Sequence, residues 1–312
     1  MDIASDSPVK TFVQASEVWI PQGDRLVFST GDYGDLAEFA AVSGKESFAC
    51  GEGLPGKAWA EGRPVVLKGF EGSYFKRTEA AKAAGLTSAV AVPVFDGATL
   101  KAVLVVLCGD DENRTGAIEV WHQEDEILKL DDGYYGAAKH FEWVSKHTQF
   151  PRGQGLPGGV WAAATPLLLR DLGTGYRFIR SEAAGKAGLT TGLGLPVPVP
   201  GDAAYVLTLL SARGTPLARR FEIWDARSAV VGAKKEAVLI DGICAREGRL
   251  WVDETEEPRR VTAWSGVVGR VLGSGVPIVE GKQPGLAAGY DTMVALPIHR
   301  DGEISHIVAW YC

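Results

Sequence analysis

Residues 75–94, FKRTEAAKAAGLTSAVAVPV, align without gaps to residues 178–197, FIRSEAAGKAGLTTGLGLPV, and 11 of the 20 positions are identical. The two stretches lie 103 residues apart in a chain of 312 residues. A match of this length at a fixed offset indicates an internal repeat, which changes the meaning of every local motif. The chain has room for three copies of a unit of this size.

The same register holds outside that stretch. SEVW ending at Trp19 matches IEVW ending at Trp121, and GEGLPG at 51–56 matches GQGLPG at 153–158, both at an offset of 102. A third, weaker copy carries FEIW ending at Trp224, and its residues 265–279 resemble residues 52–66. We therefore divide the chain into units 1–117, 118–220 and 221–312. The sequence leaves open whether they form a row or a closed pseudo-threefold body.

The pattern of each unit predicts an α+β fold. In the first unit, SEVWI and RLVFS indicate a hairpin around PQGD, residues 36–43 have helical spacing, and RPVVLKG reads as a strand. Residues 75–85 predict an Ala-rich helix that Gly85 ends in a left-handed conformation. Asp96-Gly97 between two apolar runs predicts a second hairpin. These elements give a mostly antiparallel sheet with flanking helices.

The repeated G-x-G-x-x-G spacing is the fingerprint of dinucleotide-binding folds. That role needs a buried strand before the glycines, a long helix after them and a parallel βαβ unit. The preceding segments SFAC and TQFP are not convincing buried strands, and Pro55 and Pro157 lie inside the motif. We interpret the motif as a turn that leads into a short helix, with Trp59 or Trp161 buried.

Composition excludes several classes of protein. The net charge is −7 and no basic run is present, which disfavours nucleic-acid binding. The first twelve residues lack the apolar core of a secretory signal, and the longest apolar runs are too short to cross a bilayer. The four cysteines are widely separated, as expected of reduced residues in a cytoplasmic protein.

The segments FACGEGLPGKAWAEGRPVVL, FKRTEAAKAAGL and AVAVPVFDGATLKAVLVV, with their counterparts in residues 150–210, resemble the GAF domain family. The resemblance implies a central antiparallel sheet of five or six strands with helices packed around it. It also implies a small-molecule pocket between the sheet and the loop-helix segment. GAF ligands include cyclic nucleotides, bilins, haem, small metabolites and anions, and many GAF units bind nothing and serve in dimerisation.

Specialised members of that family differ from this chain. Bilin-binding units attach their chromophore at a Cys, usually followed by His, and no Cys-His pair occurs here. GAF-type free methionine sulfoxide reductases carry a Cys where this chain has Pro55 and Pro157, and Cys50 has no second Cys beside it. We expect no enzyme activity, no catalytic residue and no cofactor. Because no output domain follows Cys312, we expect the output to lie on a partner protein.

Two arginines are the strongest candidates for ligand contacts. Arg77 and Arg180 open the Ala-rich helix at the same place in two copies. A guanidinium at a pocket mouth would hold a carboxylate or phosphate through its planar donor fork. The alternative is an ion pair with Glu79, Glu182 or a nearby Asp that fastens the helix.

Aromatic side chains recur with the same spacing and either line a pocket or fill the core. The candidates for pocket walls are Tyr33, Tyr135, Trp59, Trp161, Phe75 and Phe178. His140 and His147 could share a helix face, but no carboxylate can be placed beside them, so we expect no metal site. The third copy lacks the F-x-R-x-E helix, and we expect it to have no pocket of this type.

The sequence therefore favours a cytoplasmic sensory or regulatory protein of three GAF-like units that binds a small molecule in the first two, with an anion as one candidate. It would act through a partner signalling protein or by self-association as an oligomer. One alternative is a ligand-free structural or dimerisation scaffold, and a further one is a GAF-type reductase. Neither nucleic acid nor a membrane is expected as a partner.

Overall fold

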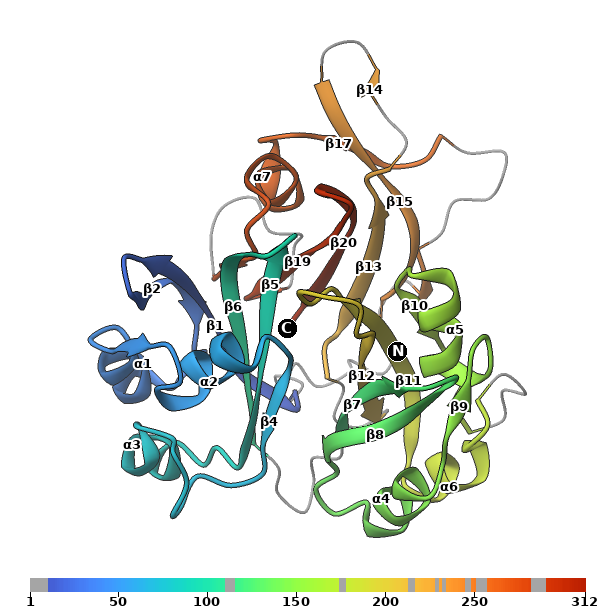
Figure 1. Ribbon diagram of the computed structural model, residues 1–312, viewed down its shortest axis with the longest axis horizontal. Helices are drawn as coiled ribbons and strands as arrows, with labels where there is room; N and C mark the ends of the chain where they lie inside the picture. The colour runs from blue at the N-terminus through green and yellow to red at the C-terminus, as the bar shows by residue number, and fades with distance from the viewer. Residues whose placement is uncertain are drawn as a thin grey trace, which may run out of the picture.

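The computed structural model describes residues 11–109, 116–173, 178–212, 217–227, 230–231, 234–244, 248–250, 257–281 and 290–312. Their strands form three antiparallel sheets that follow one another along the chain (Figure 1). Helices flank these sheets, so the α+β class expected from the sequence is confirmed.

The first sheet has the strand order β3-β2-β1-β6-β5-β4. Its strands are β1 (Val13–Gln22), β2 (Arg25–Asp32), β3 (Ser47–Ala49), β4 (Val65–Leu67), β5 (Ser88–Asp96) and β6 (Thr99–Cys108). Its helices are α1 (Ala37–Ser43), α2 (Gly53–Glu61) and α3 (Thr78–Ala83). Both predicted hairpins are confirmed, since β1 pairs with β2 and β5 pairs with β6.

The second sheet repeats this order as β10-β11-β12-β7-β8-β9. Its strands are β7 (Gly116–Glu124), β8 (Ile127–Tyr134), β9 (Phe150–Pro151), β10 (Leu167–Leu169), β11 (Leu189–Val197) and β12 (Tyr205–Ala212). Its helices are α4 (Lys139–Lys146), α5 (Gly155–Ala163) and α6 (Ser181–Lys186). β7 begins at Gly116, just before the predicted boundary between the first two units. The unit boundaries themselves stay predictions.

The third sheet follows the path β14-β15-β13-β20-β19-β18, with β16 and β17 also paired to β15. Its strands are β13 (Arg220–Asp225), β14 (Val230–Val231), β15 (Lys234–Cys244), β16 (Gly248–Arg249), β17 (Arg260–Thr262), β18 (Ile278–Glu280), β19 (Met293–Arg300) and β20 (Glu303–Tyr311). Its described helix is α7 (Gly266–Ser274). The predicted absence of an F-x-R-x-E helix concerns residues 280–297, of which 282–289 lie outside the described residues.

The segments before the glycine motif differ from expectation. SFAC and TQFP supply β3 and β9, two very short strands that pair antiparallel with β2 and β8. Each buries one phenylalanine, Phe48 or Phe150. Sequence pattern missed them because two or three residues are too few to show alternation. α2 also begins earlier than expected, at Gly53, and α3 later, at Thr78.

The glycines of the motif allow backbone conformations and close backbone contacts that other residues would not permit. Gly153 and Gly155 have φ values of 84° and 61°, which favour glycine because they are left-handed. A Cβ on Gly158 would lie 2.3 Å from the carbonyl oxygen of Pro151, so the α5 backbone packs directly on β9. The first unit repeats this with Gly56, whose Cβ would lie 2.1 Å from Ala49 O. The motif is therefore a tight turn within an antiparallel unit, as the sequence predicted.

The ends of the three equivalent helices supply a stability test. α2 and α7 end at Gly62 and Gly275 in the left-handed conformation, whereas α5 ends at Ala164 with φ 51°. Left-handed backbone costs a non-glycine residue roughly 1–2 kcal/mol. We expect Ala164→Gly to raise the thermal midpoint, offset in part by the greater chain entropy of glycine. Gly62→Ala, whose Cβ would make only an ordinary contact with Pro200 Cδ at 3.8 Å, should lower the midpoint. Unchanged midpoints in both variants would contradict this account.

The three sheets close into a ring. Val18, Val120 and Ile223 face Thr30, Asp132 and Asp241 at equivalent positions of the three sheets. Thr30, Asp132 and Asp241 each contact another sheet, at its edge strand or at the residue just after that strand. Lys68, after β4, pairs with Asp132, and Arg170, after β10, pairs with Asp241. The backbone N–H of Val279 in β18 donates to Thr30 Oγ1 at 3.3 Å and closes the ring.

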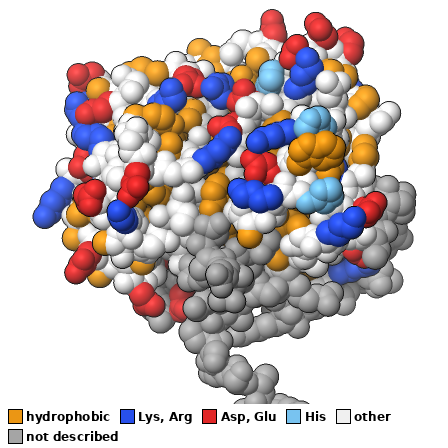
Figure 2. Space-filling model, turned by 90° about the horizontal axis from the view of Figure 1, so that it is seen from below, with side chains coloured by type: hydrophobic (Ala, Val, Ile, Leu, Met, Phe, Trp, Pro, Cys, Tyr) orange, Lys and Arg blue, Asp and Glu red, His pale blue; other side chains and the backbone are white. Residues whose placement is uncertain are grey.

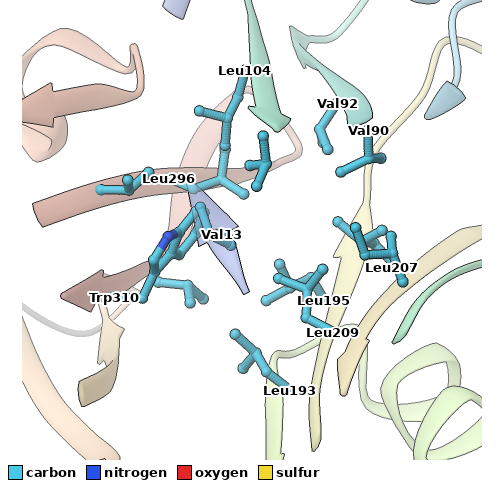
Figure 3. Close-up of a cluster of buried hydrophobic side chains, with 14 of the residues drawn as sticks. Val13, Val90, Val92, Leu104, Leu193, Leu195, Leu207, Leu209, Leu296 and Trp310 are labelled. Carbon is cyan, nitrogen blue, oxygen red and sulfur yellow. The ribbon is translucent and has the colours of Figure 1, made fainter. Parts of the chain in front are cut away.

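One hydrophobic core lies at the centre of this ring. Side chains from all three sheets point into it (Figure 3), among them Leu104 from β6, Leu195 from β11 and Trp310 from β20. Each sheet also buries a second core on its other face, beneath its own helices. The sheets are therefore covered on both faces, and the arrangement is a closed pseudo-threefold body. Among the described helices, none combines the length and the apolar character that crossing a membrane requires.

Candidate functional site

The two candidate arginines lie at the start of equivalent helices. Arg77 is the residue before α3 and Arg180 the residue before α6, and only 2% and 3% of them is exposed. Each guanidinium grips a glutamate of the first strand of its sheet, Glu17 in β1 or Glu119 in β7. In both pairs Nη2 donates to Oε2 at 2.9 Å while Nη1 contacts Oε1, which is a bidentate geometry.

Aromatic rings enclose these ion pairs. The Cζ of Arg77 lies 4.8 Å from the centroid of Phe39, and the Cζ of Arg180 lies 4.7 Å from that of Phe141. The other rings within 6.0 Å are Trp19, Phe48 and Phe75 in the first unit, and Trp121, Phe150 and Phe178 in the second. A cation over aromatic faces is favourable, and more so away from water. The side chains fill this space, so neither arginine stands at a pocket mouth.

The buried carboxylate of Glu119 is held ionised by its partners. Burial acts to raise the pKa of Glu119, but the charge and hydrogen bonds of Arg180 outweigh it, so the pKa lies below its usual value. Thr208 Oγ1 donates to Oε2 at 2.8 Å, and the hydroxyl of Tyr135 donates to Oε1 at 3.1 Å. Trp121 Nε1 donates to Oε2 at 3.2 Å. The carboxylate is thus saturated by protein donors.

The partner of each arginine corrects one of the sequence interpretations. The sequence names an ion pair with Glu79, Glu182 or a nearby Asp as the alternative to ligand binding. Glu182 instead pairs with Lys186 on the surface. The true partners are about sixty residues away in the sequence. Their signal was present as the glutamate two residues before the tryptophan in EVW, EVW and EIW.

The third sheet also contains a buried glutamate, and its cationic partner comes from a different position in the sequence. Glu222, the counterpart of Glu17 and Glu119, accepts from Arg220 Nε at 2.8 Å, two residues before it in β13. Trp224 Nε1 and the hydroxyl of Tyr311 also donate to it, both at 3.0 Å. The buried glutamate is therefore a shared feature of all three sheets, and the source of its cation varies.

Most of the aromatic candidates belong to the cores. Tyr33, Tyr135, Phe75 and Phe178 are at most 9% exposed and pack between sheet and helices. Burial, followed by the charge of the adjacent glutamate, raises the pKa of both tyrosines, so their hydroxyls stay protonated. Trp59 and Trp161 are half-buried on α2 and α5. The ligand role assigned to these side chains and to the arginines stays a prediction.

A cavity of about 430 Å³ lies where hairpins of all three sheets meet, and sequence reasoning missed it. The β5–β6 hairpin contributes Phe95, the β11–β12 hairpin contributes Val199, and the β19–β20 hairpin contributes Ile298. Trp161 of α5 lines it as well, and it is the one sequence-predicted candidate that does. Ligand pockets of this volume are common and are often found where domains meet. No local signal marks such a site, because each hairpin supplies only part of it.

Polar groups at this cavity are few. Pro196 and Pro198 form part of one wall and have no backbone N–H to donate. His299 Nε2 lies 2.9 Å from the carbonyl oxygen of Gly275, so Nε2 carries the proton in that contact. Arg300 and Asp301 lie side by side at the rim, with Nε and Oδ2 3.5 Å apart.

Two surface histidines flank an exposed tryptophan on α4. Trp143, 59% exposed, lies between His140 and His147 on α4, with ring centroids 6.5 Å and 4.4 Å away. Figure 2, the molecule seen from below, shows a hydrophobic side chain flanked by two histidines, and basic and acidic side chains interspersed around it. Within the described residues, no group of three His, Cys, Asp or Glu side chains could hold a metal ion. None of the four cysteines, all of which lie in the described part of the chain, forms a disulfide, and Cys50 is exposed.

The fold and these sites define an α+β protein of antiparallel sheets with a buried, cation-bound glutamate in each. Residues 9–124 match a family model of the GAF domain. The comparison with curated proteins gives no match.

Several solved structures are similar to parts of this chain. The GAF domain of A. aeolicus NLH2 in an inactive state is 22% identical, with a TM-score of 0.27 over 32% of this chain and 60% of that one. Free methionine-R-sulfoxide reductase from Neisseria meningitidis is 17% identical, with a TM-score of 0.25 over 32% of this chain and 53% of that one. A Staphylococcus aureus NreA mutated in its nitrate-binding site is 20% identical, with a TM-score of 0.27 over 34% of this chain and 80% of that one. The chain thus spans less than two thirds of the first two.

Proposed function

We propose that this chain is a cytoplasmic, non-enzymatic regulatory protein of three GAF-like units, 1–117, 118–220 and 221–312, which binds a small molecule and acts through a partner protein. The match of residues 9–124 to the GAF domain supports this, since GAF domains commonly bind small molecules or serve in signalling. The single observation that carries the proposal is the cavity of about 430 Å³ where the three hairpins meet.

The binding site proposed here lies between units and not inside one. Inside the first two units, Arg77 and Arg180 already hold carboxylates, and aromatic rings fill the space around them. A ligand there would have to displace a bidentate ion pair from a closed core. A ligand at the hairpins touches all three units at once, so its binding would favour one relative placement of the units. That placement is what a partner protein could read.

A native mass spectrum of freshly purified protein tests the proposal. We expect an extra small-molecule mass, lost on denaturation, at one per chain because one cavity joins the three units. Val199→Trp, which places a large ring in the cavity, should remove that mass while Val42→Trp on exposed α1 should retain it. Retention of the mass by the Val199 variant would place the ligand elsewhere.

A ligand-free scaffold is the second candidate, and the filled interiors favour it. The buried ion pairs and the aromatic cores fill the space around Arg77 and Arg180 with protein side chains. The three sheets also share one continuous hydrophobic core, as expected of a rigid scaffold protein. The same spectrum separates the two functions, because a scaffold would show a clean protein mass together with a defined oligomer.

A further inference from the structure

We infer that the cavity between the three hairpins takes an uncharged, flat, mainly apolar molecule such as a fused aromatic ring system, and not an inorganic anion or a carboxylate. This rests on the proposed function, since it names the class of ligand for the same cavity. It departs from the anion that Arg77 and Arg180 suggested in the sequence.

The walls of the cavity are apolar and include a large flat ring. Phe95, Val199 and Ile298 come from three different sheets, and Trp161 adds an indole from α5. Trp161 is half-buried, so part of its surface remains open. An aromatic ligand gains both from removing apolar surface from water and from offset stacking or edge contacts with an indole. Burial of an anion against these apolar walls would instead remove most of its hydration shell.

The proline-rich wall is poor in hydrogen-bond donors. In the segment PVPVP at 196–200, every second residue lacks a backbone N–H. Protein sites for anions depend on convergent N–H groups or on paired cations. Pro196 and Pro198 supply neither, and their fixed φ angles keep this wall in one conformation. A rigid wall costs less ordering entropy when a rigid ligand docks on it.

Charges around the cavity balance. Arg300 is next to Asp301, and Asp202 lies in the neighbouring β11–β12 turn. Arg152 stacks over Trp161 with its Cζ 5.4 Å from the ring centroid, and it adds a second exposed cation. Among the residues that line the cavity, the one arginine and the one aspartate cancel, so the lining has no net charge that would attract an anion. The two buried guanidiniums do not contribute, because each is neutralised by its own glutamate.

Two probes of the same shape test the inference. 2-Naphthamide and 2-naphthoate differ mainly in charge, and their dissociation constants can be measured at pH 7 by calorimetry, with ligand-observed NMR to detect weak binding. We expect 2-naphthamide to bind at least about tenfold more tightly than 2-naphthoate, and nitrate not to compete. Trp161→Ala should weaken 2-naphthamide by about tenfold or more. Trp59→Ala is the matched control, because Trp59 is the equivalent of Trp161 in the first unit and does not line the cavity.

The outcomes separate this inference from the function on which it rests. Equal or tighter binding of 2-naphthoate, or competition by nitrate, would overturn the uncharged class while leaving a ligand-binding cavity. Binding of 2-naphthamide that neither Trp161→Ala nor Val199→Trp weakens would place the probe elsewhere and overturn the inference as well. If neither probe binds at millimolar concentration and purified protein carries no extra mass, the proposed function fails together with it.

Discussion

Arg180→Met is expected to destabilise the protein by about 3–5 kcal/mol, because it leaves Glu119 buried without its cation. Glu119 is fully buried and receives two bonds from this guanidinium. The loss would appear as a lower midpoint in urea unfolding followed by circular dichroism. Binding of 2-naphthamide by the protein that remains folded should not change, since Arg180 does not line the hairpin cavity.

A double variant distinguishes the contribution of the Arg180–Glu119 ion pair from that of the surrounding core. Arg180→Met combined with Glu119→Gln removes both charges, and we expect it to recover part of the lost stability. Lys186→Met is the control on the same helix, because its ion pair with Glu182 is exposed and should matter little. An unchanged unfolding midpoint in Arg180→Met together with loss of 2-naphthamide binding would contradict the structural role of this arginine. The arginine would then serve a ligand, and the ion-pair account would be wrong.

Gly158→Ala is expected to cost about 1–3 kcal/mol or more, because the added methyl group would meet backbone that cannot turn aside. Its Cβ would stand 2.3 Å from the carbonyl oxygen of Pro151. Either β9 or the first turn of α5 must shift, and Trp161 shifts with that helix. Thermal unfolding should show a lower midpoint, and the affinity for 2-naphthamide should fall as well.

The neighbouring glycine gives a matched control. A Cβ on Gly159 would meet only the end of the Leu167 side chain at 3.1 Å, which can rotate. Gly159→Ala should therefore be near neutral, helped by the better helix propensity of alanine. Equal losses in the two variants would mean that helix disturbance in general, and not the contact with Pro151, explains the effect. Gly56→Ala should repeat the result of Gly158→Ala in the first unit.

Much of the fold could be predicted from the sequence because its signals are local. Asp96-Gly97 sets a hairpin, Gly85 ends a helix at φ 68°, and the repeat transfers each element to the second unit. The glycine motif could also be rejected as a nucleotide site from its context alone. The very short strands β3 and β9 escaped detection, because their existence depends on β2 and β8 beside them.

The candidate site could be predicted only in part. Sequence pattern selected Arg77 and Arg180 as special and named an ion pair as the alternative to ligand binding. It did not find Glu17 and Glu119, since sequence spacing does not show that residues sixty positions apart meet across a helix–sheet contact. Trp161 was selected as a pocket residue, but the pocket it lines lies between units.

The sequence by itself determined the repeating unit and its order of strands and helices, because periodicity and turn residues act within a few positions. It also determined the acidic net charge of the chain and the wide spacing of its cysteines. Only the tertiary structure decided which carboxylate each arginine holds, how Lys68–Asp132 and Arg170–Asp241 join the sheets into a ring, and where a cavity remains. These contacts join residues that are 60 to 71 positions apart in the sequence, and the distances between them are fixed by the packing of complete sheets around a shared core.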